Sequence, residues 1–285
     1  FSVFAPAALG AEWKGLFTGP PNGYHNTVQY PEEGWFSDLI VIDFHPTVGY
    51  RVNDKLSVGL GLAIQYGILE LRSPETIPSG ANIYPFEHFY VDAILDGSGI
   101  GYGFNVGMMY KMTDDMNFGL SYRAPTTISI EGDVKQTLYS PSAPALELED
   151  STQAHLFNGG TIVAKPDAKA DFPLPMDLGV GIAYQGTPDL TVAFDVIWTK
   201  WSDVDIVTIK MAGNGPTGTP AEYSELVLKY EDTFKFSFGF DYLLIAEHDF
   251  HIFGGYYFDP SPIPDGSLKP SIPDVNDKSS ISLGF

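Results

Sequence analysis

The sequence has no cysteine and no long apolar run, and each absence excludes a class of protein. Without cysteine there is no disulfide framework, no CxxC redox site and no cysteine-rich zinc site. No stretch approaches the roughly eighteen consecutive apolar residues of a transmembrane helix. Membrane strands escape this test, because only their alternate residues meet lipid. A chain without cysteine also fits a cell-envelope protein that avoids stray oxidation.

Positive charge is scarce as well. The 285 residues carry 15 Lys and Arg against 36 Asp and Glu, a formal net charge of -21. A phosphate backbone would be repelled, so nucleic acid is not expected as a partner. The mean hydropathy of -0.01 is too low for a helical membrane protein. Aromatic residues make up 14% and glycines number 30, which suits the aromatic girdles and small-residue walls of β-barrels.

Four short polar turns join pairs of segments that alternate between apolar and small or polar residues. In the segment Ile100 to Met112, one face carries Ile100, Tyr102 and Phe104, and the other carries glycine, asparagine and lysine. A period of two predicts a strand. The turns are Asn53-Asp54, Thr113-Asp114-Asp115, Gly186-Thr187-Pro188-Asp189 and Ala246-Glu247-His248-Asp249.

The same alternation recurs along the chain and predicts about ten strands. The further strands are expected at Ser2 to Trp13, Leu39 to Arg51, Leu56 to Ile68, Met116 to Ile130, Met176 to Gln185, Asp189 to Ile209, Phe234 to Tyr242, Phe250 to Phe258 and Ser279 to Phe285. Short turns at one end and long loops at the other are typical of bacterial outer-membrane barrels. We therefore expect an all-β fold, a transmembrane antiparallel up-and-down β-barrel, with residues 1–285 as its single domain.

Five long connections lie opposite the short turns, on the side that is extracellular in such barrels. We expect loops at Lys14 to Ser37, Ser73 to Ser98, Glu131 to Phe172, Lys210 to Asp232 and Asp259 to Lys278. The part from Ile83 to Leu95 is unusually apolar, and an exposed patch of this kind usually binds something. The candidate capture residues are Ile83, Tyr84, Phe86, Phe89, Ile94 and Leu95. The alternative, compatible with capture, is that this loop folds over the barrel mouth as a small core.

Several charged residues fall on predicted interior faces, among them Asp43, His45, Arg123, Asp177 and Asp195. They predict either a polar conduit with a carboxylate-binding site or a charge network that keeps the interior wet and rigid. Arg123 is the candidate for a ligand carboxylate, because a guanidinium can bind a carboxylate through two hydrogen bonds.

Other polar motifs predict neither a metal nor a cofactor. His248 and His251 stand in a short turn, and Asp203 with Asp205 reads as a pair of solvated rim carboxylates, although they could bind a cation or bridge lipopolysaccharide. The glycines from Gly99 to Gly107 lack the spacing of a nucleotide-binding loop. We expect no cofactor and no catalytic residues.

Several segments resemble the FadL/TodX family of outer-membrane transporters for long-chain fatty acids and other hydrophobic compounds. The segments that carry the resemblance are Gly103-Phe104-Asn105-Val106-Gly107 with Tyr110, Gly119-Leu120-Ser121-Tyr122-Arg123-Ala124-Pro125 followed by Glu131-Gly132-Asp133, Trp198-Thr199-Lys200-Trp201-Ser202, Tyr257-Phe258-Asp259-Pro260-Ser261-Pro262-Ile263-Pro264, and Pro270-Ser271-Ile272-Pro273-Asp274. The family's arginine after the last motif is missing, because Asn276-Asp277 stands in its place. The family's barrel has about fourteen strands and an N-terminal hatch with an Asn-Pro-Ala motif. We therefore expect this chain to be truncated at both ends.

The resemblance implies passive, energy-independent uptake. A hydrophobic ligand would be captured by extracellular apolar loops, pass through the lumen and leave through a lateral opening. The expected protein is a monomer in the bacterial outer membrane, with lipid and lipopolysaccharide around it and fatty acids or hydrophobic small molecules as ligands. Two alternatives remain: a general or structural porin, with a charged constriction and an open pore, and an outer-membrane acyl hydrolase, with a serine and a histidine paired on one barrel face.

Overall fold

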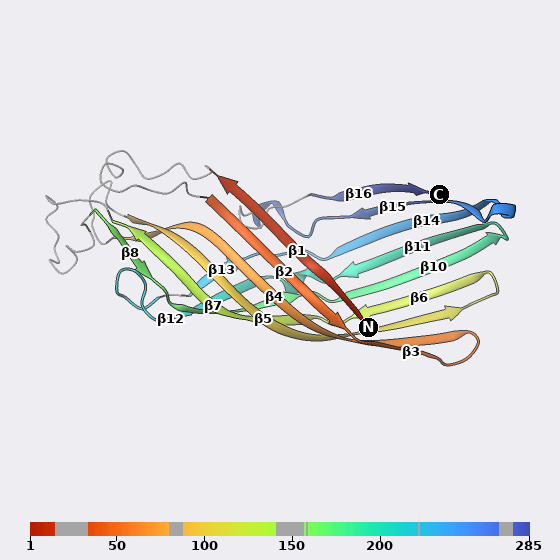
Figure 1. The fold of residues 1–285 in the computed structure, drawn as a ribbon, viewed down its shortest axis with the longest axis horizontal. Coiled ribbons are helices and arrows are strands. Elements are labelled where there is room, and N and C mark those ends of the chain that lie inside the picture. The colour runs from red at the N-terminus through yellow and green to blue at the C-terminus, as the bar shows by residue number, and fades with distance from the viewer. Residues whose placement is uncertain (15–33, 80–87, 141–156, 158, 222, 268–275) are drawn as a thin grey trace.

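The computed structural model describes residues 1–14, 34–79, 88–140, 157, 159–221, 223–267 and 276–285 as one curved antiparallel sheet (Figure 1). Sixteen strand segments build the sheet, and the helical elements in the described part are three short 3₁₀ turns. The strands are β1 (Ser2–Lys14), β2 (Gly34–His45), β3 (Thr47–Arg51), β4 (Leu56–Pro78), β5 (His88–Lys111), β6 (Met116–Arg123), β7 (Thr126–Tyr139), β8 (Thr161–Ala164), β9 (Asp167–Leu174), β10 (Asp177–Thr187), β11 (Leu190–Thr199), β12 (Ile206–Ala212), β13 (Ser224–Val227), β14 (Thr233–Ile245), β15 (Phe250–Asp259) and β16 (Lys278–Gly284), and the turns are η2 (Trp201–Asp203), η3 (Ala246–His248) and η4 (Asp265–Ser267).

The sixteen segments make ten long strands in an up-and-down order, because five of the long strands are interrupted. For example, β2 and β3 both pair with β4, and β6 and β7 both pair with β5. The other interrupted strands are β8–β9–β10, β11–β12 and β13–β14. The predicted number of strands and their up-and-down order are confirmed. Strands β1 and β16 are the two edges of the described sheet, since β1 pairs only with β2 and β16 only with β15.

The four predicted turns are confirmed, and they lie together at one end of the sheet (Figure 1, right). Side chains fix their geometry. In the β3–β4 turn, Asn53 Oδ1 accepts hydrogen bonds from the backbone N–H groups of Lys55 and Leu56 at 2.8 and 2.9 Å. In the β14–β15 turn, Asp249 takes the left-handed conformation with φ 51, which aspartate tolerates better than most residues.

The strands continue much further beyond the membrane-facing band than predicted, so the boundaries of four predicted loops are wrong. Strands β4 and β5 have 23 and 24 residues and form one hairpin that pairs from Leu56–Tyr110 to Pro78–His88. The expected loop Ser73 to Ser98 is therefore strand from Ser73 to Pro78 and from His88 to Ser98. Likewise, β2 begins at Gly34, β7 reaches Tyr139, and β8, β9 and β13 lie inside expected loops. The sequence analysis missed those strand parts because their outward residues are polar, whereas the outward residues of the lower, lipid-facing parts are apolar.

Along the strands, the apolar residues change from the outer face of the sheet to its inner face. Near the turns, Leu60, Leu62 and Ile64 of β4 are exposed on the outer face, whereas the inner face carries glycine and serine. Further up, the inner face is apolar and buried. The buried cluster there is Leu39, Val41, Leu69, Ala93, Leu95, Ile128, Ile130, Val134 and Ala168. On the outer face at this level, five carboxylates are in register across five strands: Asp38, Glu70, Asp96, Asp133 and Asp167.

The strand interruptions fall at one level of the wall. Register places Gly61, Asn105, Arg123, Asp177 and Thr199 in one row across β4, β5, β6, β10 and β11. Prolines lie just above this row, where Pro46 separates β2 from β3, Pro125 separates β6 from β7, and Pro175 separates β9 from β10. Proline has no N–H to give to a strand ladder, so each proline ends the regular pairing. The segment from Arg123 to Ser129 also holds one residue more than its partner from Asn105 to Ile100, so the inward face changes from odd to even residues there.

Candidate functional site

Four hollows lined by the described residues lie on the inner face of the sheet. The uppermost, which we call the upper cavity, has a volume of about 330 Å³. At the level of the strand interruptions lies a belt cavity of about 90 Å³. Below it is an open concavity of about 510 Å³. A side cavity of about 440 Å³ lies between β1 and the Pro-rich segment after β15.

The upper cavity is lined mainly by apolar side chains from both sides of the curved sheet. Its apolar lining consists of Trp35, Leu71, Pro74, Ala93, Leu95, Val134, Ile209, Met211 and Leu226. The polar lining includes Arg72, which forms a two-point ion pair with Asp92: Nε to Oδ1 is 2.8 Å and Nη2 to Oδ2 is 3.0 Å. Arg72 and Asp92 alternate with the inward-facing Leu71 and Ala93, so this pair lies on the outer face of the hairpin, behind the cavity wall.

Glu75 lines the same cavity, above the lipid-facing part of β4, which ends at Ile68. Burial raises the pKa of its carboxyl above the ordinary value of 4.5, and a hydrogen bond from Ser73 partly opposes that shift. Desolvation favours the neutral form of a carboxylic acid. The buried acidic side chain of the cavity lining, Glu75, is thus driven toward its neutral form.

The structure places the predicted capture residues in different surroundings. Leu95 lines the upper cavity. Phe89, 1% exposed, packs in a separate small core with Val91, Leu138 and Phe157, and the two phenylalanine rings have centroids 5.1 Å apart. Ile94 lies half-buried on the opposite face of β5.

Three of those predicted residues, Ile83, Tyr84 and Phe86, lie outside the described residues. The prediction missed the contributions of β4, β12 and β13 to the cavity, including Arg72. The alternation of Leu69 and Leu71 with Glu70 and Arg72 was the signal that β4 continues upward with an apolar inner face.

The belt cavity lies inside a polar network on the inner face. His45 is at its centre: Nδ1 is 3.3 Å from Asp43 Oδ1, and Nε2 is 3.0 Å from Asn105 Oδ1. Gln65 Nε2 donates to the other oxygen of Asp43 at 3.3 Å. The cavity is closed on its apolar side by Phe4, Pro6, Ala63 and Ala124.

Arg123 is on the inner face, as predicted, and lines the belt cavity. Its Nη2 is 3.0 Å from Asp177 Oδ2, and Thr199 Oγ1 donates to Asp177 Oδ1 at 2.7 Å. The charged residues of this level therefore form pairs with one another, which is the structural network that the sequence left as an alternative. The side chain of Arg123 remains half exposed toward the interior.

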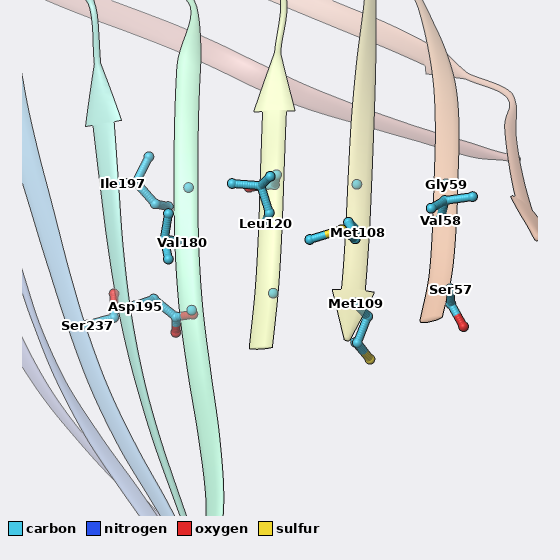
Figure 2. A pocket seen from close by; sticks show the side chains of 15 residues that line it. Ser57, Val58, Gly59, Met108, Met109, Leu120, Val180, Asp195, Ile197 and Ser237 are labelled. Carbon is cyan, nitrogen blue, oxygen red and sulfur yellow. The ribbon is translucent and has the colours of Figure 1, made fainter. Parts of the chain in front are cut away.

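The lower concavity is an open, small-residue surface that crosses six neighbouring strands (Figure 2). Glycine and serine from β4, β5, β6 and β10 form much of it, including Gly59, Gly107, Gly119 and Gly179. Asp195 and Ser237 supply polar groups at one side. The wide hollow has no closed pocket geometry, and it lies directly below the belt.

Among the described residues no group of three or more His, Cys, Asp and Glu side chains could hold a metal ion. Of the two histidines expected in a turn, His248 ends η3 but His251 lies in strand β15, where its Nδ1 is 2.6 Å from Asp241 Oδ1. In the same part of the chain, none of the helical elements has the length and apolarity required to cross a membrane.

The sequence of this antiparallel sheet matches a known protein family. Residues 18–285 match the model of a family described as outer membrane protein transport protein (OMPP1/FadL/TodX). The chain belongs to the FadL/TodX family. The resemblance that the motifs indicated is thus confirmed, and with it the location in the bacterial outer membrane.

Relatives of this FadL/TodX chain are distant in sequence but alike in fold. A long-chain fatty acid transport protein of Escherichia coli is 23% identical over 270 residues, which is 88% of this chain and 56% of that protein. The structure of a Pseudomonas aeruginosa FadL homologue superposes with a TM-score of 0.74 at 18% identity, covering 99% of this chain and 60% of the other. The Ralstonia pickettii toluene transporter TbuX gives a TM-score of 0.63 at 21% identity, covering 90% and 64%. The chain spans a little over half the length of the curated relatives that it matches, and its fold is that of the FadL/TodX β-barrels.

Proposed function

We propose that this protein carries hydrophobic compounds, long-chain fatty acids or aromatic hydrocarbons among them, passively across the outer membrane. The observation that carries the proposal is the upper cavity, an interior space with a mainly apolar lining. Burying an apolar ligand there gains about 25 cal/mol for each Å² removed from water. The relatives support the same class of cargo, since one is a fatty acid transport protein and another a toluene transporter.

The inner surface supports a transporter over a general porin. Between the upper cavity and the belt, Val41 and Ile128 are fully buried within the apolar cluster. An aqueous pore needs a continuous wet path, whereas the described inner face at this level consists of packed apolar side chains. A hydrophobic ligand would have to displace or bypass these side chains, whereas a hydrated sugar would have to lose its water to enter.

The side cavity supports a lateral route. It is lined by Ala7 and Leu9 of β1, by Phe172 and by the Pro-rich segment from Pro260 to Ile263. Pairing of β1 with β2 is irregular between Phe4 and Ala7, and such an irregularity weakens the wall locally. We propose that ligands captured near Leu95 leave beside β1, with Phe89 and Ile94 shaping the β4–β5 hairpin and Ile83, Tyr84 and Phe86 extending the capture surface.

The polar belt supports a non-enzymatic role. An acyl hydrolase would need an imidazole nitrogen available to a serine, but both ring nitrogens of His45 are engaged by Asp43 and Asn105. His45 is thus held in the hydrogen-bond network of the wall by Asp43 and Asn105. We further propose that the protein acts as a monomer, surrounded by lipid and lipopolysaccharide, and needs no cofactor.

Reconstitution into liposomes tests the proposed transport. Vesicles with the protein should take up toluene or oleate faster than protein-free vesicles, and should not swell faster in isosmotic glucose. A Leu226→Trp variant, which places a large ring in the upper cavity, should slow uptake. Rapid swelling in sugar, with no gain in toluene or oleate uptake, would establish a porin instead. Light scattering of the purified protein gives the oligomeric state.

A further inference from the structure

The wall of the upper cavity contains one carboxyl group, that of Glu75 on β4. The residues that share its face of the strand include Leu71 and Ile77, and both pack on buried apolar clusters of the inner face. Because side chains alternate along a strand, the Glu75 side chain also points to the interior. It is half-buried, so a group held in the cavity can reach it.

This carboxyl receives little support from its surroundings. Ser73 Oγ lies 3.5 Å from Glu75 Oε1, and Ser73 is the hydrogen-bond partner of the carboxyl within the described part of the chain. The residue opposite Glu75 in the β4–β5 ladder is Val91, which is 3% exposed. An ionised carboxyl without a counter-charge is costly in apolar surroundings, and this burial raises the pKa of Glu75 above 4.5.

The charged side chains of the neighbouring strands face away from the cavity. A residue next to an inward residue in a strand points outward. By this alternation, the charged residues that flank the cavity on β4, β5, β7, β12 and β13 lie on the outer face: Arg72, Asp92, Lys135, Lys210 and Glu225. Arg72 and Asp92 also neutralise each other there. Among the described residues, the ionisable side chain that faces the cavity is therefore that of Glu75, and it lacks a cation.

The chemistry of this lining restricts the ligand that can complete the site. A carboxylate in the wall repels an ionised acid and attracts a cation. An ammonium group is suited to it, because it carries three hydrogen-bond donors and forms strong charge-assisted hydrogen bonds. Trp35 adds an aromatic ring to the lining, and the faces of such rings attract ammonium groups as well. The other lining residues are mainly apolar and favour a hydrocarbon body.

We propose that the upper cavity is a binding site for hydrophobic amines, whose ammonium group pairs with the Glu75 carboxylate while the hydrocarbon body lies against Leu71, Leu95 and Leu226. This inference rests on the proposed transport of hydrophobic compounds and names a favoured class among them. The volume of about 330 Å³ is at the lower end of the range of small-molecule sites, about 300–1,000 Å³. A fatty acid would occupy this cavity in its neutral form.

Three probes with the same ring and different charges test the site: 4-methylbenzylamine, p-xylene and 4-methylbenzoate. Their dissociation constants are measured at pH 7 by titration calorimetry on the protein in phosphatidylcholine nanodiscs, against empty nanodiscs. The amine is protonated at this pH, as the similar side chain of lysine is. Glu75→Gln should weaken binding of the amine about tenfold, the effect of one lost charge-assisted hydrogen bond. The same variant should leave p-xylene unchanged and strengthen binding of 4-methylbenzoate.

Two further pairs of variants locate the effect. Glu70→Gln removes the same charge from the outer face of the same strand and should bind all three probes as the unmodified protein does. Leu226→Trp fills the cavity and should weaken all three probes, whereas Val227→Trp, on the opposite face of β13, should weaken none. Thermal unfolding shows whether each variant is folded.

Proton release from the unmodified protein gives a test that needs no variant. Below the folded-state pKa of Glu75 the carboxyl holds a proton, and a bound ammonium group displaces that proton to the buffer. Titrations in two buffers of different ionisation enthalpy, at pH values from about 5 to about 8, count the protons released. Release should accompany the amine, be largest at the acid end and decline as the pH rises, and it should be absent for p-xylene. An amine that binds without proton release over this range would overturn the proposal.

The remaining outcomes also decide. Equal weakening of the amine by Glu70→Gln and Glu75→Gln would mean that the overall negative charge attracts it, with no site at Glu75. Amine binding that Glu75→Gln leaves unchanged would refute the site as well. The proposed transport fails separately. A protein that binds the amine through Glu75 but does not speed entry of p-xylene or the amine into liposomes has the site without the transport. One that carries p-xylene but binds the amine independently of Glu75 has the transport without the site.

Discussion

Arg72 and Asp92 join the two strands of the longest hairpin through two parallel hydrogen bonds, 2.8 and 3.0 Å long, at the wall of the upper cavity. Asp92 is buried and the Arg72 side chain is 28% exposed. A pair in this position satisfies two charges that neither water nor the surrounding apolar residues could satisfy as well. It therefore fixes the hairpin from its outer face, behind the wall of the ligand space.

Removing one member of this pair should destabilise the protein strongly. Asp92→Asn leaves the guanidinium without its counter-charge, and should lower the free energy of unfolding by about 3 kcal/mol. The double variant Arg72→Met with Asp92→Leu removes both charges and should recover most of that loss. Urea unfolding of the variants in lipid vesicles measures the difference. A double variant as unstable as the single one would show that the pair does more than cancel charge.

A side chain at Gly61 should break the polar belt. A Cβ built at this position meets Asn105 Oδ1 and His45 Nε2, the two atoms of one belt hydrogen bond. Gly61→Ala should therefore lower stability by about 1–3 kcal/mol. Gly49→Ala is the matched control, because a Cβ there meets nothing within 4 Å. The midpoint of thermal unfolding should fall for the first variant only, and equal midpoints would contradict the belt geometry.

Filling the upper cavity should slow transport without opening or closing the barrel wall. Leu226 of β13 lines the cavity, and its neighbour Val227 lies on the opposite face of the strand. Leu226→Trp should reduce uptake of toluene or oleate into liposomes about tenfold, the effect of about 1.4 kcal/mol. Val227→Trp adds the same ring outside the cavity and should leave uptake unchanged. If both variants transport normally, the upper cavity is not on the route.

Stability should fall as the pH rises through the titration of Glu75. Burial raises the pKa of this carboxyl in the folded protein above the ordinary value of 4.5, so the folded state holds the proton more tightly than the unfolded state. The stabilisation is present below pH 4.5 and is lost as the pH rises through the folded-state pKa. Glu75→Gln should remove this part of the pH dependence and make the protein more stable at pH 7. The control is Glu225→Gln, at an exposed position of the same cavity.

Denaturant titrations at a series of pH values from 4 to about 8 test this behaviour. If Glu75→Gln and the unmodified protein keep parallel curves, the carboxyl is not titrating in a buried environment. A variant less stable than the parent at pH 7 would show that the Glu75 charge is favourable in the folded state.

The sequence predicted the strands and turns of the lower wall well, because the outward residues of most strands meet lipid and alternate with small or polar residues. Asp43 and His45 were also assigned to the interior by that alternation. Their partners Gln65 and Asn105 were not predicted, since a period of two gives the face of a residue but not its cross-strand neighbour. Those neighbours depend on the register, which the Asn53 turn and the break at Pro46 set together.

The upper wall was harder to predict for a different reason. Above Ile68 and Ile100 the outer residues become polar, as in Glu70 and Asp96, and the segment looks like a loop when judged by the lipid-facing pattern. The apolar residues are still present, but they face inward. The hairpin that positions Leu95 can be recognised only when both faces are followed separately along the strand.

The five aligned carboxylates on the outer face have an electrostatic consequence for the whole wall. Neighbouring strands are about 4.8 Å apart, so the row from Asp38 to Asp167 is a line of negative charge about 20 Å long. Each charge is closer to the next than the Debye length of about 8 Å at physiological ionic strength. The five carboxylates therefore repel one another, and this repulsion favours separation of the strands. The backbone hydrogen bonds between the strands hold the wall together against it, and dissolved salt weakens the repulsion by screening.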